Sequence, residues 1–166
     1  SWNRRGFRGE AQARGFVACV ASTRTALFTR FALRWRACAP AAMVGLYVAS
    51  IAAIGTALLG NAFYAATKAE AAILTRRFAM ELGADGITVN AVAPGFIRTD
   101  MTQGKRSADE WKAIEKSLAE RTMMGRIGQP ADIANAVTFF AAPEAGWVTA
   151  QLLVVDGGRM DYIGHG

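Results

Sequence analysis

The run Met43–Ala49 is apolar at every position, and this feature limits the fold most strongly. A strand with one face in water alternates apolar and polar residues, whereas a strand of a parallel sheet is covered by helices on both faces and is apolar throughout. We therefore predict a buried parallel strand here. Two further strands are expected at Ile87–Ala93, before Pro94-Gly95, and at Leu152–Val155, before Asp156-Gly157-Gly158.

Helical patterns separate these strands. Helices are expected at Ala62–Leu82, near Ala108–Leu118, and from Pro130 to just before Pro143. The first places Leu74, Phe78 and Leu82 on one face, with Gly83 as a plausible end, and the last places Ile133, Val137 and Phe140 inward. Strand, helix, strand, helix and strand in this order predict an α/β fold with a doubly wound parallel sheet.

The basic charge gathers in the first forty residues. Residues 1–40 hold eight arginines against one acid, a net charge of +7, whereas residues 41–166 hold eleven basic and twelve acidic side chains, a net charge of −1. Four interpretations stay open: a transit peptide, a nucleic-acid-binding arm, a membrane-associated leader, or off-frame translation of a GC-rich gene. We favour the last, and predict a basic, poorly ordered segment 1–40 before a partial catalytic domain 41–166.

A membrane span is a second alternative, because no charged residue occurs from Ala37 to Thr67. We prefer to divide this stretch into a strand, a loop around Gly60 and the start of a helix, so neither a membrane nor a nucleic acid is an expected partner. Metal chemistry is not expected either, since Cys19, Cys38 and His165 have no metal-ligand spacing.

Tyr64 and Lys68 are the strongest catalytic candidates from the residues alone. They lie four apart in the predicted helix and therefore share a face, one turn apart. A nearby ammonium favours the phenolate form of a tyrosine, which suits proton exchange near neutral pH. Ser50 ends the preceding strand, where the carboxyl ends of parallel strands line a ligand crevice. The structural alternatives are a packed tyrosine, a solvated lysine and a serine in a turn.

Several motifs occur in a fixed order. Ser50 is followed by Tyr64-Ala-Ala-Thr-Lys68 and by Val-Asn-Ala-Val-Ala-Pro94-Gly95-Phe-Ile97-Arg-Thr99. Gly125-Arg-Ile-Gly-Gln-Pro130 and Val-Val-Asp156-Gly-Gly158 come later. This series resembles the short-chain dehydrogenase/reductase family, most closely its 3-oxoacyl-[acyl-carrier-protein] reductase-like branch, over about residues 43–160.

The resemblance implies a role for each matching residue. Tyr64 is expected to act as general acid or base, Lys68 to hold the nicotinamide ribose, and Ser50 to orient a substrate carbonyl. Pro94, Gly95, Ile97 and Thr99 are expected to line the nicotinamide of NAD or NADP, with the Ile97 backbone and the Thr99 hydroxyl on its carboxamide. Asn90 and Asp156 match structural positions, and residues 100–125 match a variable lid over the substrate.

The resemblance does not include the amino-terminal part of the family pattern. No strand followed by a glycine-rich turn, which binds the cofactor pyrophosphate, is recognisable in residues 1–40. We therefore expect the carboxy-terminal part of a Rossmann-type sheet with its cofactor-binding half missing.

Two functions are compatible with this interpretation. The first is a cytoplasmic, homo-oligomeric, NAD(P)-dependent oxidoreductase that transfers hydride between nicotinamide and a small carbonyl or alcohol. The second is a truncated chain without catalysis that serves only as an oligomerisation or interaction module.

Overall fold

The computed structural model describes residues 16–18, 44–55 and 59–159, which form an α/β structure around one parallel sheet. Its four strands are adjacent in sequence order: β1 (Phe16–Ala18), β2 (Val44–Val48), β3 (Thr88–Pro94) and β4 (Leu152–Val155). Every neighbouring pair is parallel, with Leu46 opposite Asn90 and Ala91 opposite Leu152. Parallel neighbours need crossover connections: α2 lies between β2 and β3 in the chain, and α5 lies between β3 and β4.

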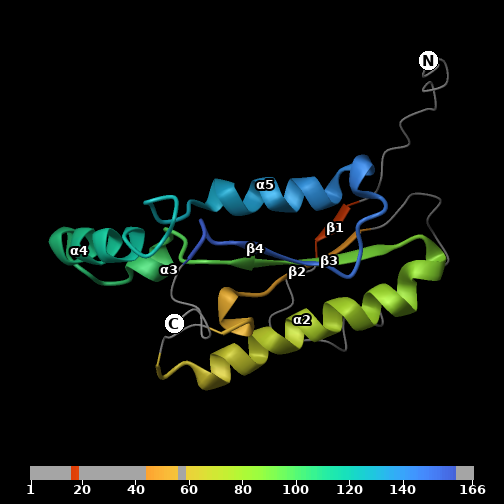
Figure 1. Cartoon of the computed structure of the whole chain (residues 1–166), viewed down its shortest axis with the longest axis horizontal. Coiled ribbons are helices and arrows are strands. Elements are labelled where there is room, and N and C mark those ends of the chain that lie inside the picture. The colour runs from red at the N-terminus through yellow and green to blue at the C-terminus, as the bar shows by residue number, and fades with distance from the viewer. Residues whose placement is uncertain (1–15, 19–43, 56–58, 160–166) are drawn as a thin grey trace, which may run out of the picture.

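Helices α2 (Ala62–Leu82) and α5 (Pro130–Ala141) cover opposite faces of the sheet (Figure 1). Alternate residues of β2 and β3 pack against one helix or the other. Tyr47, Val89 and Ala91 belong to the core on the α2 side with Phe78 and Leu82. Leu46 and Val92 pack with Phe140 of α5 on the other side. This two-sided burial explains why β2 is apolar throughout.

The chain beyond β3 builds a separate helical unit. Helices α3 (Asp100–Gln103) and α4 (Ala108–Ala119) follow the carboxyl end of β3 and lie beyond that end of the sheet (Figure 1). Ser107 and Glu110 form a capping box at the start of α4. The hydrogen bonds from the Ser107 backbone and hydroxyl to the Glu110 carboxylate lower the pKa of Glu110 below its ordinary value.

The predicted elements agree with the structure, with small differences at their ends. Helix α2 has the predicted bounds, and Pro130 occupies the first turn of α5 as expected. Gly83 does follow the last residue of α2, but it has a right-handed backbone; a short 3₁₀ turn (Gly83–Asp85) continues the chain, and the left-handed residue is Gly86, with φ of 72°.

Strand β1 was not predicted from the sequence. Its three residues lie among the arginines of segment 1–40, and they pair with the first three residues of β2. The rest of that segment lies outside the described residues, so its predicted poor order remains a prediction. In the described part of the chain, no helix is long and apolar enough to cross a membrane.

Candidate functional site

Ser50 lies just beyond the carboxyl end of β2, where the prediction placed it. Its side-chain oxygen accepts a hydrogen bond from the Ala52 backbone N–H at 3.2 Å and caps a short 3₁₀ turn, Ile51–Ala53. This bond uses a lone pair of the oxygen, so the hydroxyl hydrogen remains available for another acceptor. The residue is half-buried at the end of the sheet.

Tyr64 and Lys68 lie in the first two turns of α2, on a common face. The Lys68 Nζ is 5.7 Å from the centroid of the Tyr64 ring and donates a hydrogen bond to the Val48 carbonyl oxygen at 3.3 Å. Tyr64 is 51% exposed, so a ligand can reach its side chain. Val48 precedes Ser50 by two residues, and the lysine therefore joins the tyrosine to the strand end that carries the serine. An ammonium has three donors, and two remain beyond the bond to Val48.

Pro94 and Gly95 carry the chain out of β3. The Gly95 N–H donates to the Val155 carbonyl oxygen at 3.0 Å, which continues the pairing with β4. A Cβ atom on Gly95 would lie 2.6 Å from the Cβ and 2.8 Å from the Cα of Asp156. Glycine is thus required here for close packing against the loop after β4, and this packing shapes the segment that Ile97 belongs to.

The backbone N–H of Ile97 points away from the segment that pairs with its neighbours Phe96 and Arg98. The Gly128 N–H donates to the Phe96 carbonyl oxygen at 3.0 Å, and the Arg98 N–H donates to the Gly128 carbonyl oxygen at 2.8 Å. In an extended segment the N–H and C=O of one residue point to the same side and those of the next residue to the opposite side. Phe96 and Arg98 bond to Gly128, so the N–H and C=O of Ile97 face away from it. The C=O accepts from the Thr102 hydroxyl at 2.8 Å, whereas the N–H has no partner among the described residues.

The Thr99 hydroxyl is partly engaged in hydrogen bonds within the protein. Its hydroxyl oxygen accepts from the Thr102 N–H at 3.2 Å, and the two threonines form a capping box at the start of α3. The hydroxyl is exposed and also lies 3.1 Å from the Thr102 hydroxyl. Thr102, which sequence reasoning did not select, therefore holds both Ile97 and Thr99.

Two further contacts tie the helical unit to the segment after β3. The Phe96 and Trp111 ring centroids are 6.1 Å apart, and Trp111 is only 3% exposed. Arg98 and Glu115 form an ion pair at 3.3 Å. These contacts hold α4 against the 94–99 segment, and the lid role expected for residues 100–125 stays a prediction. The Phe96–Trp111 pair itself had no sequence signal beyond the aromatic residue types.

An ion pair between Arg126 and Asp132 stabilises the turn before α5. The pair was not predicted, although an acidic residue two positions after Pro130 is typical of a helix start. Hydrogen bonds from the Arg126 guanidinium and from the Gln129 N–H lower the pKa of Asp132 from 3.8 to about 2. The carboxylate is therefore charged throughout the neutral range.

Two cavities border this region. One of about 670 Å³ lies between α4 and the Gly125–Gln129 segment, and Ser50, Tyr64 and Lys68 are not among its lining residues. A smaller one of about 240 Å³ is lined by Ile97, Asp132, Asp156 and neighbouring residues.

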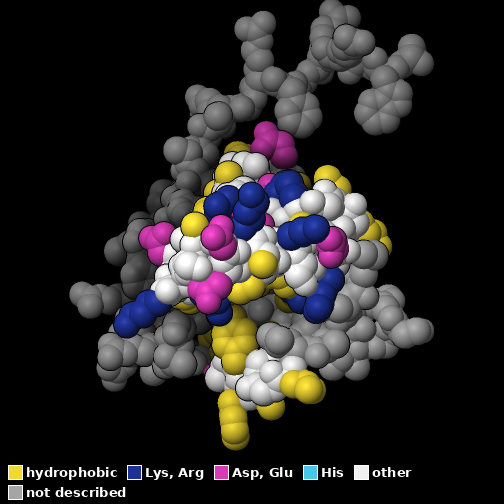
Figure 2. Space-filling view, turned by 90° about the vertical axis from the view of Figure 1, so that its left-hand side faces the viewer, with side chains coloured by type: hydrophobic (Ala, Val, Ile, Leu, Met, Phe, Trp, Pro, Cys, Tyr) yellow, Lys and Arg dark blue, Asp and Glu magenta, His cyan; other side chains and the backbone are white. Residues whose placement is uncertain are grey.

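Figure 2 shows Lys and Arg side chains interspersed with Asp and Glu on the end of the molecule that it views. The described residues contain no group of three or more His, Cys, Asp or Glu side chains suited to a metal ion.

Comparison with known proteins points to one family. The model of the family described as Enoyl-(Acyl carrier protein) reductase matches residues 11–159, and so begins before Met43, where the sequence motifs start. The chain is 43% identical over 112 residues to the short-chain reductase protein NovJ of Streptomyces niveus, which covers 66% of this chain and 42% of that protein. It is 43% identical over 99 residues to 3-oxoacyl-[acyl-carrier-protein] reductase FabG of Vibrio cholerae, covering 60% and 38%.

Solved structures agree with these relatives. A 7α-hydroxysteroid dehydrogenase complexed with NADH and 7-oxo glycochenodeoxycholic acid is 37% identical, with a TM-score of 0.64 over 74% of this chain and 46% of that one. A 4-hydroxyisoleucine dehydrogenase complexed with NADH is 27% identical, with a TM-score of 0.66 over 80% and 52%. The chain spans less than half the length of the curated relatives that it matches.

Proposed function

This chain belongs to the short-chain dehydrogenase/reductase family, and from that premise we propose that it carries the catalytic residues of an NAD(P)-dependent oxidoreductase acting on a small carbonyl/alcohol pair. Ser50, Tyr64 and Lys68 are the proposed catalytic residues, and Tyr64, Lys68, Pro94, Gly95, Ile97 and Thr99 are the proposed nicotinamide-side residues. We further propose that it acts in the cytoplasm.

The free donors at the carboxyl end of the sheet suit a nicotinamide nucleotide. The Ile97 N–H is without a partner among the described residues and suits a carboxamide oxygen, and the exposed Thr99 hydroxyl lies on the same segment. Lys68 has donors left for ribose hydroxyls after its bond to Val48. These groups fit the nicotinamide ribose end of the cofactor, and Lys68 holds it beside Tyr64.

The proposed reaction needs one proton at the substrate oxygen. The bound nicotinamide supplies or accepts the hydride. Tyr64 donates its phenolic proton to the carbonyl oxygen as charge develops there, and takes a proton from the alcohol in the reverse direction. Ser50 donates a hydrogen bond to the same oxygen, and so orients it and stabilises that charge. Lys68 lies beside the Tyr64 ring, with its Nζ 5.7 Å from the ring centroid, and is the proposed holder of the nicotinamide ribose.

One observation carries the proposal: Lys68 contacts the end of β2 and the Tyr64 ring at once. A lysine on a solvated helix face extends into water and needs no strand carbonyl. The 5.7 Å between Nζ and the ring centroid is also within the range in which a cation acts on an aromatic ring. The arrangement therefore favours the catalytic interpretation of the four-residue spacing over the structural one.

The test measures NAD(P)H oxidation with a panel of small ketones and acyl thioesters, in the 166-residue chain and in a fusion that supplies the amino-terminal half of a 3-oxoacyl-[acyl-carrier-protein] reductase. Lys68→Met is expected to lower kcat/KM for the cofactor by about 10- to 100-fold, because it removes charged hydrogen bonds. Arg76→Met, at an exposed position two turns further along α2, is the control and keeps the wild-type rate. Equal rates in both variants contradict the role of Lys68.

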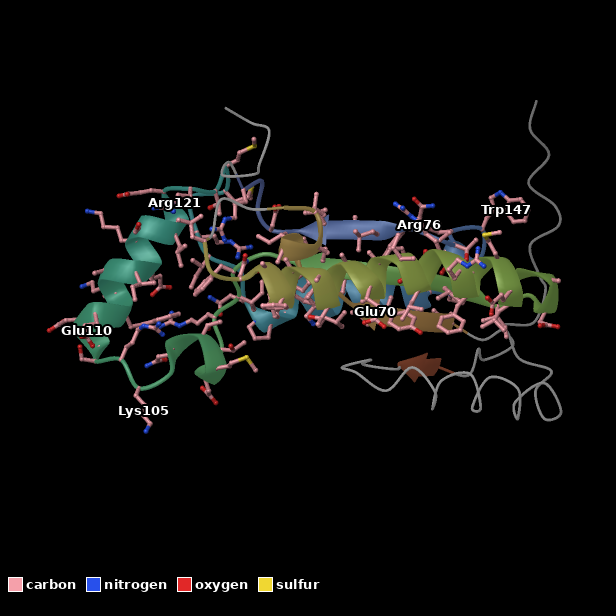
Figure 3. All side chains as sticks on the ribbon, turned by 90° about the horizontal axis from the view of Figure 1, so that it is seen from below. Glu70, Arg76, Lys105, Glu110, Arg121 and Trp147 are labelled. Carbon is pink, nitrogen blue, oxygen red and sulfur yellow. The ribbon has the colours of Figure 1, made fainter. Side chains whose placement is uncertain are left out.

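A second candidate function, assembly without catalysis, is favoured by the outer face of α2. Phe63, Ala66, Glu70, Ile73, Arg77 and Met80 are exposed and repeat at alternating intervals of three and four residues. Figure 3 views this helix from the side away from the sheet. The repeat is that of helix pairing, and in an antiparallel pair Glu70 of one copy lies near Arg77 of the other. We propose a homo-oligomer that uses this face.

Light scattering after size exclusion tests the assembly. The wild-type chain is expected to have a mass that is a multiple of 17.7 kDa, and Ile73→Lys to shift it to the monomer because an unpaired charge replaces an apolar side chain at the centre of this face. Lys105→Ala, in the loop between α3 and α4 (Figure 3), is the control. A monomeric wild-type chain overturns this candidate and leaves the oxidoreductase proposal standing.

A further inference from the structure

The Arg126–Asp132 ion pair holds the turn at Gly128 through hydrogen bonds to the residue before it and the residue after it. The Arg126 Nη1 donates to the Asp132 Oδ2 at 2.7 Å and the Nη2 donates to the Oδ1 at 2.9 Å, so the guanidinium engages the carboxylate as a fork. The same Nη1 lies 3.1 Å from the Ile127 carbonyl oxygen, which accepts a hydrogen bond from it. The Oδ2 also accepts from the Gln129 N–H at 2.7 Å. The residues on either side of Gly128 are thus both held by one pair of side chains.

Gly128 packs in close contact with Ile97. Its N–H and C=O form the two hydrogen bonds to Phe96 and Arg98 that flank Ile97. A Cβ atom on Gly128 would collide with the Ile97 Cδ1 atom, so the two segments are packed closely. The orientation of the Ile97 peptide therefore depends on where the Gly128 turn is held.

We propose that Arg126 and Asp132 are positioning residues for the nicotinamide side of the cofactor: by holding the Gly128 turn, they aim at the carboxamide the Ile97 N–H, which has no partner among the described residues. This inference rests on the proposed function. Neither side chain touches the cofactor in this role; both act through Gly128. The chain of contacts runs from the ion pair to Ile127 and Gln129, then to Gly128, and then to the peptide groups on both sides of Ile97.

The simpler alternative is a surface ion pair that only caps α5. Asp132 is the third residue of that helix and forms a capping box with Gln129. A cap stabilises its own helix and leaves a loop on β3 unaffected. The two roles therefore predict different exchange rates for the Arg98 and Gly128 amides when the ion pair is removed and the cap is kept.

Asp132→Asn separates the roles, because the amide oxygen still accepts from the Gln129 N–H while the charge pair to Arg126 is lost. Hydrogen exchange followed by NMR measures the Arg98 and Gly128 amides, whose hydrogen bonds lie on either side of Ile97. We expect the Arg98 and Gly128 amides to exchange about threefold to tenfold faster in this variant, with the α5 amides unchanged. Arg126→Lys, which keeps the charge and loses the fork, is expected to lie between wild type and Asp132→Asn.

Glu115→Gln is the matched control. It removes an ion pair of similar exposure, Arg98–Glu115, from the same region without touching the Gly128 turn. Its Gly128 amide is expected to exchange at the wild-type rate. Faster exchange confined to α5 in Asp132→Asn, or no change at all, overturns the proposal in favour of a cap.

The link to the cofactor is tested with two probes, NADH and ADP-ribose, which differ in the nicotinamide. In an NMR titration extended into the high millimolar range, NADH but not ADP-ribose is expected to shift the Ile97 amide, and Asp132→Asn to weaken that response at least about threefold with ADP-ribose binding unchanged. A wild-type chain without a nicotinamide-specific response overturns the proposed function and this inference with it. A response that persists unchanged in Asp132→Asn overturns this inference alone.

Discussion

Replacing Tyr64 with phenylalanine is expected to slow carbonyl reduction by roughly 10²–10⁴-fold, the usual contribution of a positioned general acid. The variant removes one oxygen and retains the ring, so the contact of Lys68 with the aromatic face survives. Tyr64 is half exposed in the first turn of α2, outside the buried core, and within the described ranges its hydroxyl forms no hydrogen bond that the variant would break. Fold and cofactor binding are therefore expected to remain close to wild type.

The measurement compares kcat of wild type and variant in the fusion with the amino-terminal half of a relative, with circular dichroism to verify folding. Phe63→Leu is the control: the adjacent residue is 91% exposed and carries no group able to donate a proton. It is expected to keep most of the activity. A Tyr64→Phe variant that keeps more than about a tenth of the wild-type rate contradicts the acid/base role.

The sheet and its two large helices could be predicted because their signals are local. A strand buried on both faces needs apolar residues at each position, and β2 has them: Leu46 packs toward α5 and Tyr47 toward α2. Glycine and proline then mark where strands and helices end. Tyr64 and Lys68 could be paired for the same reason, since their contact lies within one helix. Strand β1 lacked such a signal because three apolar residues among arginines have no measurable period.

The rest of the site depends on segments that are far apart in the sequence. Gly95 requires the Asp156 loop against it, and Gly128 requires Ile97. A glycine in the sequence indicates only that a turn or a close approach is possible, without naming its neighbour. The bond from Lys68 to Val48 is of the same kind, because it joins a helix to a strand twenty residues earlier. These contacts follow from the tertiary arrangement and from no pattern within one segment.

The second large effect concerns cofactor affinity. The polypeptide of residues 1–166 by itself is expected to bind NAD(P)H with a Kd of roughly a millimolar or weaker, which corresponds to about −4 kcal/mol. In doubly wound folds most dinucleotide affinity comes from a glycine-rich turn, a helix N-terminus at the pyrophosphate and an adenosine pocket. No such turn is recognisable in residues 1–40, and the proposed donors of Lys68, Ile97 and Thr99 reach only the nicotinamide ribose end.

The expected affinity follows from a comparison of two contributions. Two or three hydrogen bonds contribute about 0.5–1.5 kcal/mol each, and somewhat more where Lys68 supplies a charge. Association costs about 4 kcal/mol or more in lost translational and rotational freedom. Fluorescence titration should therefore show no saturation in the micromolar range, whereas the fusion with a relative's amino-terminal half should saturate there. A micromolar Kd for the 166-residue chain contradicts this prediction, and would mean that residues 1–40 contribute pyrophosphate or adenosine contacts that their sequence does not reveal.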